Sequence, residues 1–179
     1  MRRFFIWTGI LTAAAVSVFG QRVPQPDSRN DPRVALLRNF FRAFHSPVSH
    51  LAPDFLAAAD RHGLDWRLLP SLSVVESGGG KNAPKNNIFG WASARRSFTS
   101  VRGSIDWVAS RIAHSKLYQD KDLDGILATY NRRAGYAARV KSVMKLIAPD
   151  QTVGALYSLR ARINPANGPQ QPALPAPVP

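Results

Sequence analysis

The chain has 179 residues, of which 45% are hydrophobic, enough for one compact domain with tails. It contains no cysteine, which excludes disulfides, thiolate metal sites and cysteine nucleophiles. With 24 lysines and arginines against 11 acids, the formal net charge is +13. Such a charge favours polyanionic partners, although a solvated basic surface is the alternative.

The first twenty residues are typical of an export signal. Two arginines precede an apolar stretch over residues 4–18, which ends in small residues before Gln21. The stretch is shorter than the roughly 20 residues that span a bilayer, so we expect a cleaved signal peptide rather than an anchor. The mature protein is then periplasmic or extracellular and associated with the cell wall. There the available polyanions are cell-wall polymers and anionic lipids, not nucleic acid.

After a flexible leader over residues 21–30, amphipathic patterns predict a mostly α domain spanning residues 31–150. Asp31 and Asp122 are expected to be N-caps, and a fourth helix is expected to begin at Ser100 or Ser104. Pro70 predicts a slight kink in the helix over residues 66–76. Residues 77–87 are expected to be a loop, residues 88–91 an extended segment, residues 95–98 a turn or small strand, and residues 151–179 a Pro-rich disordered tail. Helices are expected over residues 32–44, 53–62, 66–76, from 100 or 104 to about 112, from 123 to about 130, and 136–148.

Glu76 is the one glutamate of the chain. It follows Leu68 and Leu72 by two turns and one turn of helix, so it lies on or beside the buried face, at the helix's C-terminal end. Burial and the negative end of the helix dipole both favour a neutral carboxylic acid. Such an acid can protonate the leaving oxygen of a glycosidic bond. The glycines at 78–80 are expected to leave room for a polymer. The alternative is a half-buried glutamate bonded to backbone.

Three motifs surround this residue in a recognisable order: residues 69–78 (LPSLSVVESG), residues 86–91 (NNIFGW), and residues 128–131 (ATYN) with Tyr136 and Val140. Together they resemble the lysozyme-like peptidoglycan hydrolases. The most similar branch is the bacterial glucosaminidases (mannosyl-glycoprotein endo-β-N-acetylglucosaminidase-like), with the soluble lytic transglycosylases as relatives. The resemblance covers about residues 53–148. It implies an α+β lysozyme-like fold, in which a groove separates a helical lobe from a small, reduced β-lobe.

The resemblance also implies roles for individual residues. Glu76 matches the catalytic acid, and Tyr130 matches a tyrosine that positions this acid or stabilises positive charge at the sugar. Side chains and backbone groups around both residues are expected to bind the glycan. The expected substrate-binding residues are Ser77, Asn87, Phe89, Gly90, Trp91, Asn131 and Tyr136. Phe89 and Trp91 could instead be core residues, and the basic set Arg95, Arg96, Arg132 and Arg133 could attract anionic polymers or be solvated surface.

One departure from the family pattern concerns a second carboxylate. Many glucosaminidases of this type are thought to use one from the β-lobe, whereas residues 77–119 contain only Asp106, inside a predicted helix. Either the N-acetyl group of the substrate acts as nucleophile, or the product is an anhydro sugar as in lytic transglycosylases. Asp106 is a weak candidate. No cofactor or metal is implied, and the four histidines lack ligand spacing.

We therefore expect a monomeric, exported enzyme that cleaves β-1,4 links between N-acetylglucosamine and N-acetylmuramic acid. Two other classes of function stay open. The first is a non-catalytic peptidoglycan-binding or envelope scaffold module that keeps the fold. The second is a basic membrane-active protein, in which the amphipathic helix over residues 32–44 lies on the membrane rather than packing on the domain.

Overall fold

The computed structural model of the protein describes residues 31–163; the expected signal peptide, leader and residues 164–179 of the expected tail lie outside the described residues. Seven α-helices and two short 3₁₀ helices account for most of this part, so the prediction of a mostly helical domain is confirmed. In chain order they are α1 (Pro32–Ala43), η2 (Ser49–Leu51), α2 (Ala52–His62), α3 (Leu68–Ser77), η3 (Pro84–Asn86), α4 (Val101–His114), α5 (Leu123–Tyr130), α6 (Tyr136–Ile147) and α7 (Asp150–Ile163).

Side-chain caps begin three of the helices. The carboxylate of Asp31 accepts a hydrogen bond from the backbone N–H of Arg33, and that of Asp122 accepts one from Gly125. The hydroxyl of Ser100 likewise accepts from the N–H of Gly103. These oxygens satisfy amide groups that have no partner within the first turn of a helix. The predicted N-caps Asp31 and Asp122 are thus confirmed, and Ser100 is the cap of α4.

The cause of the expected kink at Pro70 is absent, because α3 begins two residues later than predicted. Leu68 is its first residue, so Pro70 lies in the first turn. An amide at that position has no acceptor within the helix, so proline costs no hydrogen bond there. The first such bond runs from the N–H of Ser71 to the carbonyl of Arg67.

The expected disordered tail needs correction over residues 151–163, which belong to α7. The backbone N–H groups of Thr152 and Val153 both donate to the carbonyl of Pro149, and Val153 packs against the core. Asp150, at the start of the helix, accepts a hydrogen bond from Arg67 at 2.7 Å. Pro149 therefore ends one helix and introduces the next.

No strand is present in residues 31–163, so the expected small β-lobe is not confirmed. Residues 88–91 and 95–98 lie instead in a long loop between α3 and α4. The amide of Asn86 donates to the carbonyl of Phe98, and the N–H of Phe98 donates to Lys85. Cross-loop bonds of this kind, rather than a strand ladder, satisfy the backbone here.

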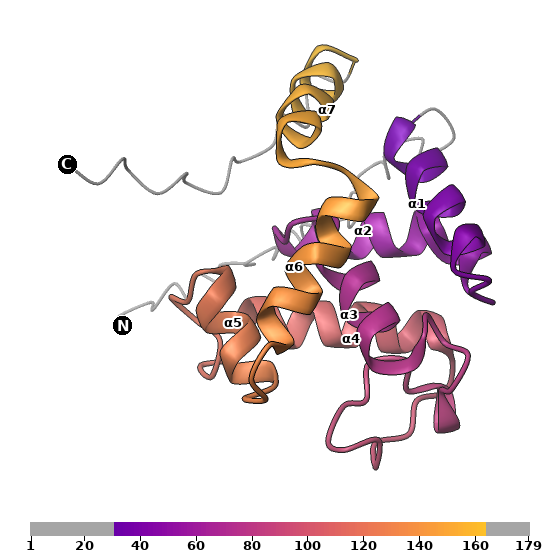
Figure 1. Ribbon diagram of the computed structural model, residues 1–179, viewed down its shortest axis with the longest axis vertical. Helices are drawn as coiled ribbons and strands as arrows, with labels where there is room; N and C mark the ends of the chain where they lie inside the picture. The colour runs from indigo at the N-terminus through magenta and orange to yellow at the C-terminus, as the bar shows by residue number, and fades with distance from the viewer. Residues whose placement is uncertain (1–30, 164–179) are drawn as a thin grey trace, which may run out of the picture.

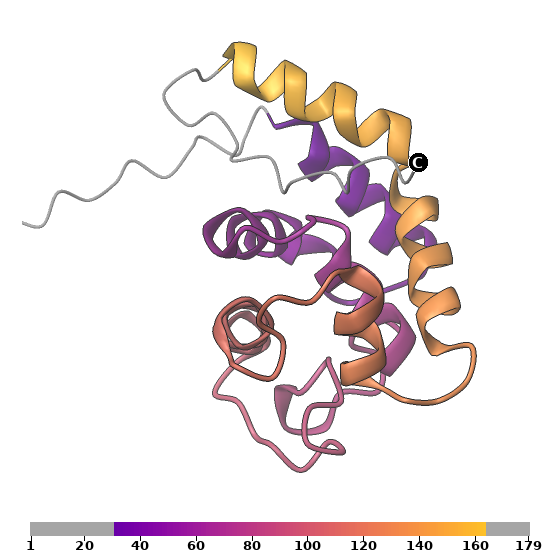
Figure 2. The ribbon, with the colours of Figure 1, turned by 90° about the vertical axis from the view of Figure 1, so that its left-hand side faces the viewer.

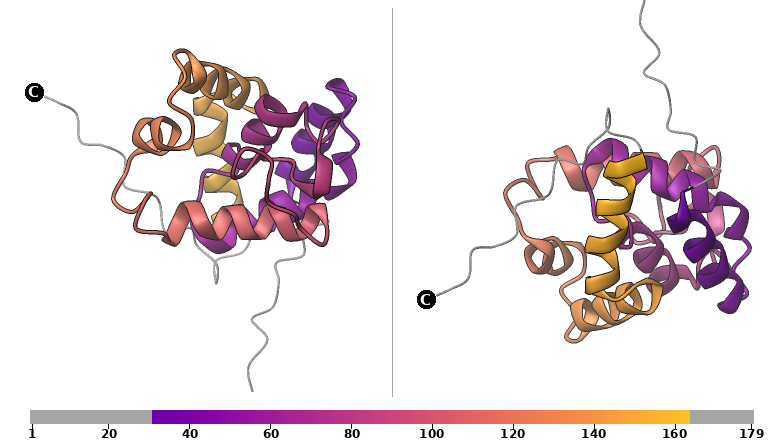
Figure 3. Two further views of the ribbon diagram at one scale, coloured as in Figure 1. Left: turned by 90° about the horizontal axis from the view of Figure 1, so that it is seen from below. Right: turned by 90° about the horizontal axis from the view of Figure 1, so that it is seen from above.

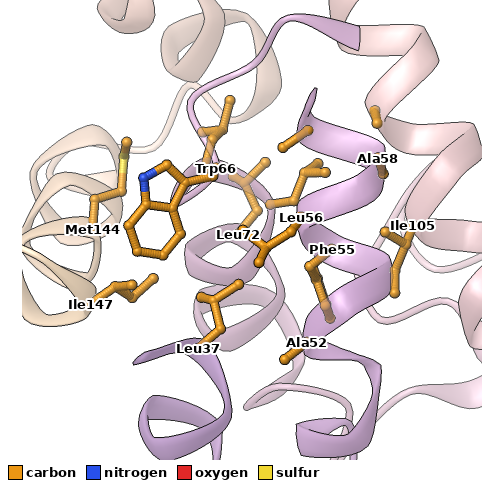
Figure 4. Packing of buried hydrophobic residues seen from close by; sticks show 14 of the residues in the cluster. Leu37, Ala52, Phe55, Leu56, Ala58, Trp66, Leu72, Ile105, Met144 and Ile147 are labelled. Carbon is orange, nitrogen blue, oxygen red and sulfur yellow. The ribbon is translucent and has the colours of Figure 1, made fainter. Parts of the chain in front are cut away.

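One hydrophobic core joins α1, α2, α3, α4 and α6. Figure 4 shows the indole of Trp66 between Leu72 of α3 and Met144 and Ile147 of α6, while Phe55 of α2 lies toward Ile105 of α4. Trp66 and Phe55 are completely buried. The packing of α3 on α6 positions the site described below, because it sets the end of α3 beside the start of α6.

Figures 1 and 2 show α7 at one end of the molecule and the loop between α3 and α4 at the opposite end. Seen from below and from above, α4 runs along one side (Figure 3). The buried side chain of Arg33 pairs with Asp31, just before α1, and with Asp60 of α2. These ion pairs join α1 to α2. No helix within residues 31–163 combines the length and hydropathy needed to cross a bilayer.

Candidate active site

Glu76 is the next-to-last residue of α3 and is half-buried. The helix ends at Gly78, whose φ of 66° is in the left-handed region. The hydroxyl of Tyr136, the first residue of α6, donates a hydrogen bond to Glu76 Oε1 at 2.7 Å. Because Tyr136 is itself 1% exposed, this bond holds one carboxylate oxygen, Oε1, from inside the protein.

Gly90 lies directly against the second oxygen. A Cβ at this position would stand 2.8 Å from Glu76 Oε2, closer than side-chain carbons approach a neighbouring atom. Its φ of 61° is also left-handed, a conformation that glycine adopts without steric cost. Both the backbone conformation and the close approach to Glu76 therefore require glycine here.

Tyr130, the last residue of α5, ties the same loop to the helices. Its hydroxyl donates to the carbonyl of Phe89 at 2.7 Å, just before Gly90. Its ring stacks on that of Tyr136, with centroids 6.2 Å apart and planes at 7°. The ring of Trp91 meets it edge-on at 5.7 Å. These aromatic contacts join the α5–α6 turn to the loop that follows α3.

Glu76, Gly90, Trp91 and Tyr130 are among the residues that line a pocket with a volume of about 480 Å³. The other walls come from the loop after Trp91, from the segment between α4 and α5, and from the turn between α5 and α6. Glu76 is the only acid among the lining residues, and Arg132 is the only base. The complete lining is Glu76, Gly90, Trp91, Ala92, Ser93, Tyr118, Tyr130, Asn131 and Arg132.

The two stacked tyrosines are strongly biased toward their protonated form. Burial, followed by the hydrogen bond to Glu76 and the charge of Glu76, raises the pKa of Tyr136 above its usual value. Burial and the charge of Glu76 also raise the pKa of Tyr130 well above the usual range. Both phenols thus stay protonated, and remain hydrogen-bond donors, throughout the neutral pH range.

Five of the nine residues expected in the site line the pocket: Glu76, Gly90, Trp91, Tyr130 and Asn131. The structure brings these together from three separate segments of the chain. Trp91 is half-buried and contributes to the lining of the pocket. Asn131 lies at the pocket, where its side-chain oxygen also accepts a hydrogen bond from the N–H of Arg133.

The other four expected residues do not reach the pocket, so their assignment to direct substrate binding is corrected. Asn87 is 1% exposed, and its side chain bonds the backbone of Trp91 and Arg96. The hydroxyl of Ser77 shares its one proton between the carbonyls of Ile88, at 2.7 Å, and Ser73, at 3.0 Å, and accepts from the N–H of Gly80.

Phe89 and Tyr136 complete this group. The ring of Phe89 is fully buried and packs against Phe55, which makes it a core residue. Tyr136 is nearly as buried, and its hydroxyl reaches Glu76 rather than open space. All four side chains hold the site in shape from within.

The glycines at 78–80 serve packing and backbone conformation rather than access for a polymer, which corrects the expectation. A Cβ on Gly79 would stand 2.6 Å from the hydroxyl of Ser46, and one on Gly80 would meet Val48 at 3.0 Å. Each of the three also has a positive φ. A glycine does lie beside Glu76, but it is Gly90 rather than one of the three glycines that follow Glu76 in the sequence.

Asp106 takes no part in the pocket. It lies on α4, its side chain is 51% exposed, and it pairs with Arg61 and His62 of α2. No acid other than Glu76 lines the pocket. In the described part of the chain, no group of three or more histidine or acidic side chains could hold a metal ion.

Four lining residues carried little signal in the sequence: Ala92, Ser93, Tyr118 and Arg132. Tyr118 lies in a polar segment without periodicity, and its ring contacts Trp91 at 6.3 Å. In the sequence, Arg132 could not be distinguished from the other arginines of the basic set, whereas in the structure it is the one member of that set that lines the pocket. Ala92 and Ser93 have left-handed backbone conformations, which no local residue preference indicates.

Comparisons with protein-family models, with curated proteins and with solved structures return no match for this chain.

The close approach of Gly90 to Glu76 is tested by a matched pair of glycine variants. Gly90 and Gly135 both have a left-handed φ, but a Cβ on Gly135 would meet nothing within 4 Å. Gly135→Ala should lower the free energy of unfolding by about 1–2 kcal/mol, the cost of the conformation alone. Gly90→Ala should cost at least about 1 kcal/mol more, because the methyl group collides with the carboxylate. Urea denaturation measures both, and equal losses would contradict the geometry.

The raised pKa of Tyr136 predicts how stability changes in alkali. Below about pH 10 the phenol is protonated in both the folded and the unfolded chain, so its contribution is constant. Above that pH the unfolded chain ionises first, and the free energy of unfolding falls. In Tyr136→Phe this fall, measured by urea denaturation between pH 9 and 11, should be smaller by about 1 kcal/mol. A fall as steep as in the unsubstituted protein would show that Tyr136 ionises normally.

Proposed function

We propose that the protein is an exported glycosidase that cleaves β-1,4 links between N-acetylglucosamine and N-acetylmuramic acid in peptidoglycan, with Glu76 as its general acid and base. One observation carries the proposal: a single carboxyl group faces a pocket, one of its oxygens held by Tyr136 and the other lying over Gly90. This leaves one oxygen able to exchange a proton with a bound molecule.

The walls of the pocket suit a sugar. Trp91, Tyr118 and Tyr130 contribute aromatic faces and edges, against which the C–H groups of a pyranose ring can pack. Asn131 and the backbone around Gly90 offer polar groups for acetamido substituents. In this proposal the pocket is part of the glycan groove, and the loop over residues 78–100 takes the place of a β-lobe.

In the proposed reaction, Glu76 donates its proton from Oε2 to the glycosidic oxygen as the C1–O bond breaks. The carbonyl oxygen of the substrate's own N-acetyl group attacks C1 and forms a cyclic intermediate. The carboxylate of Glu76 then takes a proton from a water molecule that attacks C1 and reopens the ring. A single protein carboxyl group suffices for this route, in keeping with the absence of a second acid among the lining residues.

A lytic transglycosylase is the alternative outcome at the same site. There the carboxylate of Glu76 takes the proton from the C6 hydroxyl of muramic acid, whose oxygen closes an anhydro ring on C1. Both routes use the same groups of the protein and differ only in which oxygen attacks second. The products distinguish them.

Digestion of purified cell walls tests the proposal. The unsubstituted protein should release glycan fragments, and Glu76→Gln should lower the rate by at least about 100-fold, because amide cannot donate the proton. Asp106→Asn is the matched control, since Asp106 lies outside the pocket, and it should cleave at the unsubstituted rate. Mass spectrometry then identifies reducing-end N-acetylglucosamine, reducing-end muramic acid or anhydro-muramic acid.

Two results would contradict the enzyme. Wall binding without any released fragment would support the non-catalytic scaffold module. Leakage of anionic vesicles that persists in Glu76→Gln, with no wall digestion, would support the membrane-active protein.

A further inference from the structure

Arg132 is the one basic residue that lines the pocket. It follows Tyr130 directly, in the turn between α5 and α6, and it lines the same pocket as Glu76. It is exposed, and within residues 31–163 no hydrogen bond or ion pair engages its side chain. Among the residues that the structure describes, the pocket thus contains a cation with no ion-pair partner.

We propose that Arg132 binds a carboxylate of the substrate, and that it makes the pocket specific for acidic over neutral saccharides. This inference rests on the proposed function and adds the chemical class that the site selects. Glu76 lines the same pocket, but its carboxylate is hydrogen-bonded by Tyr136, and no hydrogen bond or ion pair joins it to Arg132. A guanidinium group can bind a carboxylate through two parallel N–H···O bonds, which gives both strength and orientation.

The turn that carries Arg132 is held at both ends. Tyr130 and Tyr136 flank it and stack on each other. Inside it, Asn131 Oδ1 accepts from the N–H of Arg133 at 3.1 Å, and Gly135 closes it in a left-handed conformation with φ 75°. Within this turn, Arg132 lines the pocket and Arg133 does not.

Peptidoglycan offers carboxylates from two sources. One is the lactyl group of muramic acid, which is free on strands whose peptides have been removed. The other is the set of acidic residues in the attached peptides. Both present the same group to a guanidinium, whereas an oligomer of N-acetylglucosamine has the same backbone of sugars without any charge.

Binding measured without turnover tests the inference. In the Glu76→Gln protein, calorimetry compares three ligands: neutral N-acetylglucosamine oligomers, glycan strands stripped of peptide, and strands that retain peptide. Adding Arg132→Gln should weaken binding of the acidic strands about 10- to 100-fold, the loss expected for hydrogen bonds to a charged group, and leave the neutral oligomer unchanged.

Arg133→Gln is the matched control, because its side chain is exposed and does not line the pocket. It should leave the affinity for all three ligands unchanged. Weaker binding of the stripped strands assigns the carboxylate to the lactyl group, and weaker binding of peptide-bearing strands alone assigns it to the peptide. Both results support the inference.

Equal losses in Arg132→Gln and Arg133→Gln would overturn the inference and leave only a general attraction between opposite charges. An equal loss for the neutral oligomer would overturn it too, as would failure of all strands to bind. The proposed function fails separately: the unsubstituted protein would then bind acidic strands through Arg132 and release no fragment from them.

Discussion

The hydrogen bond from Tyr136 to Glu76 is the contact on which the site depends. It connects α6 to α3, which are far apart in the sequence, and it belongs to a ring of contacts that begins and ends at Glu76. Tyr136 stacks on Tyr130, and Tyr130 bonds the carbonyl of Phe89. The next residue, Gly90, lies against the other oxygen of Glu76. A shift in any one of these residues would move the carboxyl group, which is why so many buried side chains surround one acid.

The same helix pair is fastened at its far end. Arg67 precedes α3, and it donates to the carbonyl of Ala148, which follows α6, and to Asp150 of α7. The two helices therefore run in opposite directions, with an arginine clamp at one end and Glu76 at the other. Between the clamps, Trp66 and Leu72 pack on residues of α6 (Figure 4). A core of this kind gives the site a rigid base, which the proton donor of the proposed reaction needs if its geometry is to be set before a ligand arrives.

The sequence predicted what depends on local chemistry. Caps such as Asp122 and the position of Glu76 at a helix end follow from patterns within a few residues. Contacts between distant segments were harder: Tyr130 and Tyr136 were both expected at the site, but which hydroxyl reaches Glu76 depends on how α5 and α6 pack. The burial of Asn87 and the placement of Tyr118 depend on a loop whose shape comes from contacts made across it. The helix after Pro149 was missed because proline was taken as the end of helical structure.

The role of Tyr136 as a positioning residue for Glu76 is tested most directly by a double-mutant cycle on the rate of glycan cleavage. If Tyr136 acts through Glu76, Tyr136→Phe should lower kcat by about 10-fold or more with little change in KM. Adding the same change to Glu76→Gln should then cost nothing further. Full activity in Tyr136→Phe, or losses that multiply in the double variant, would show that the hydrogen bond does not position the acid.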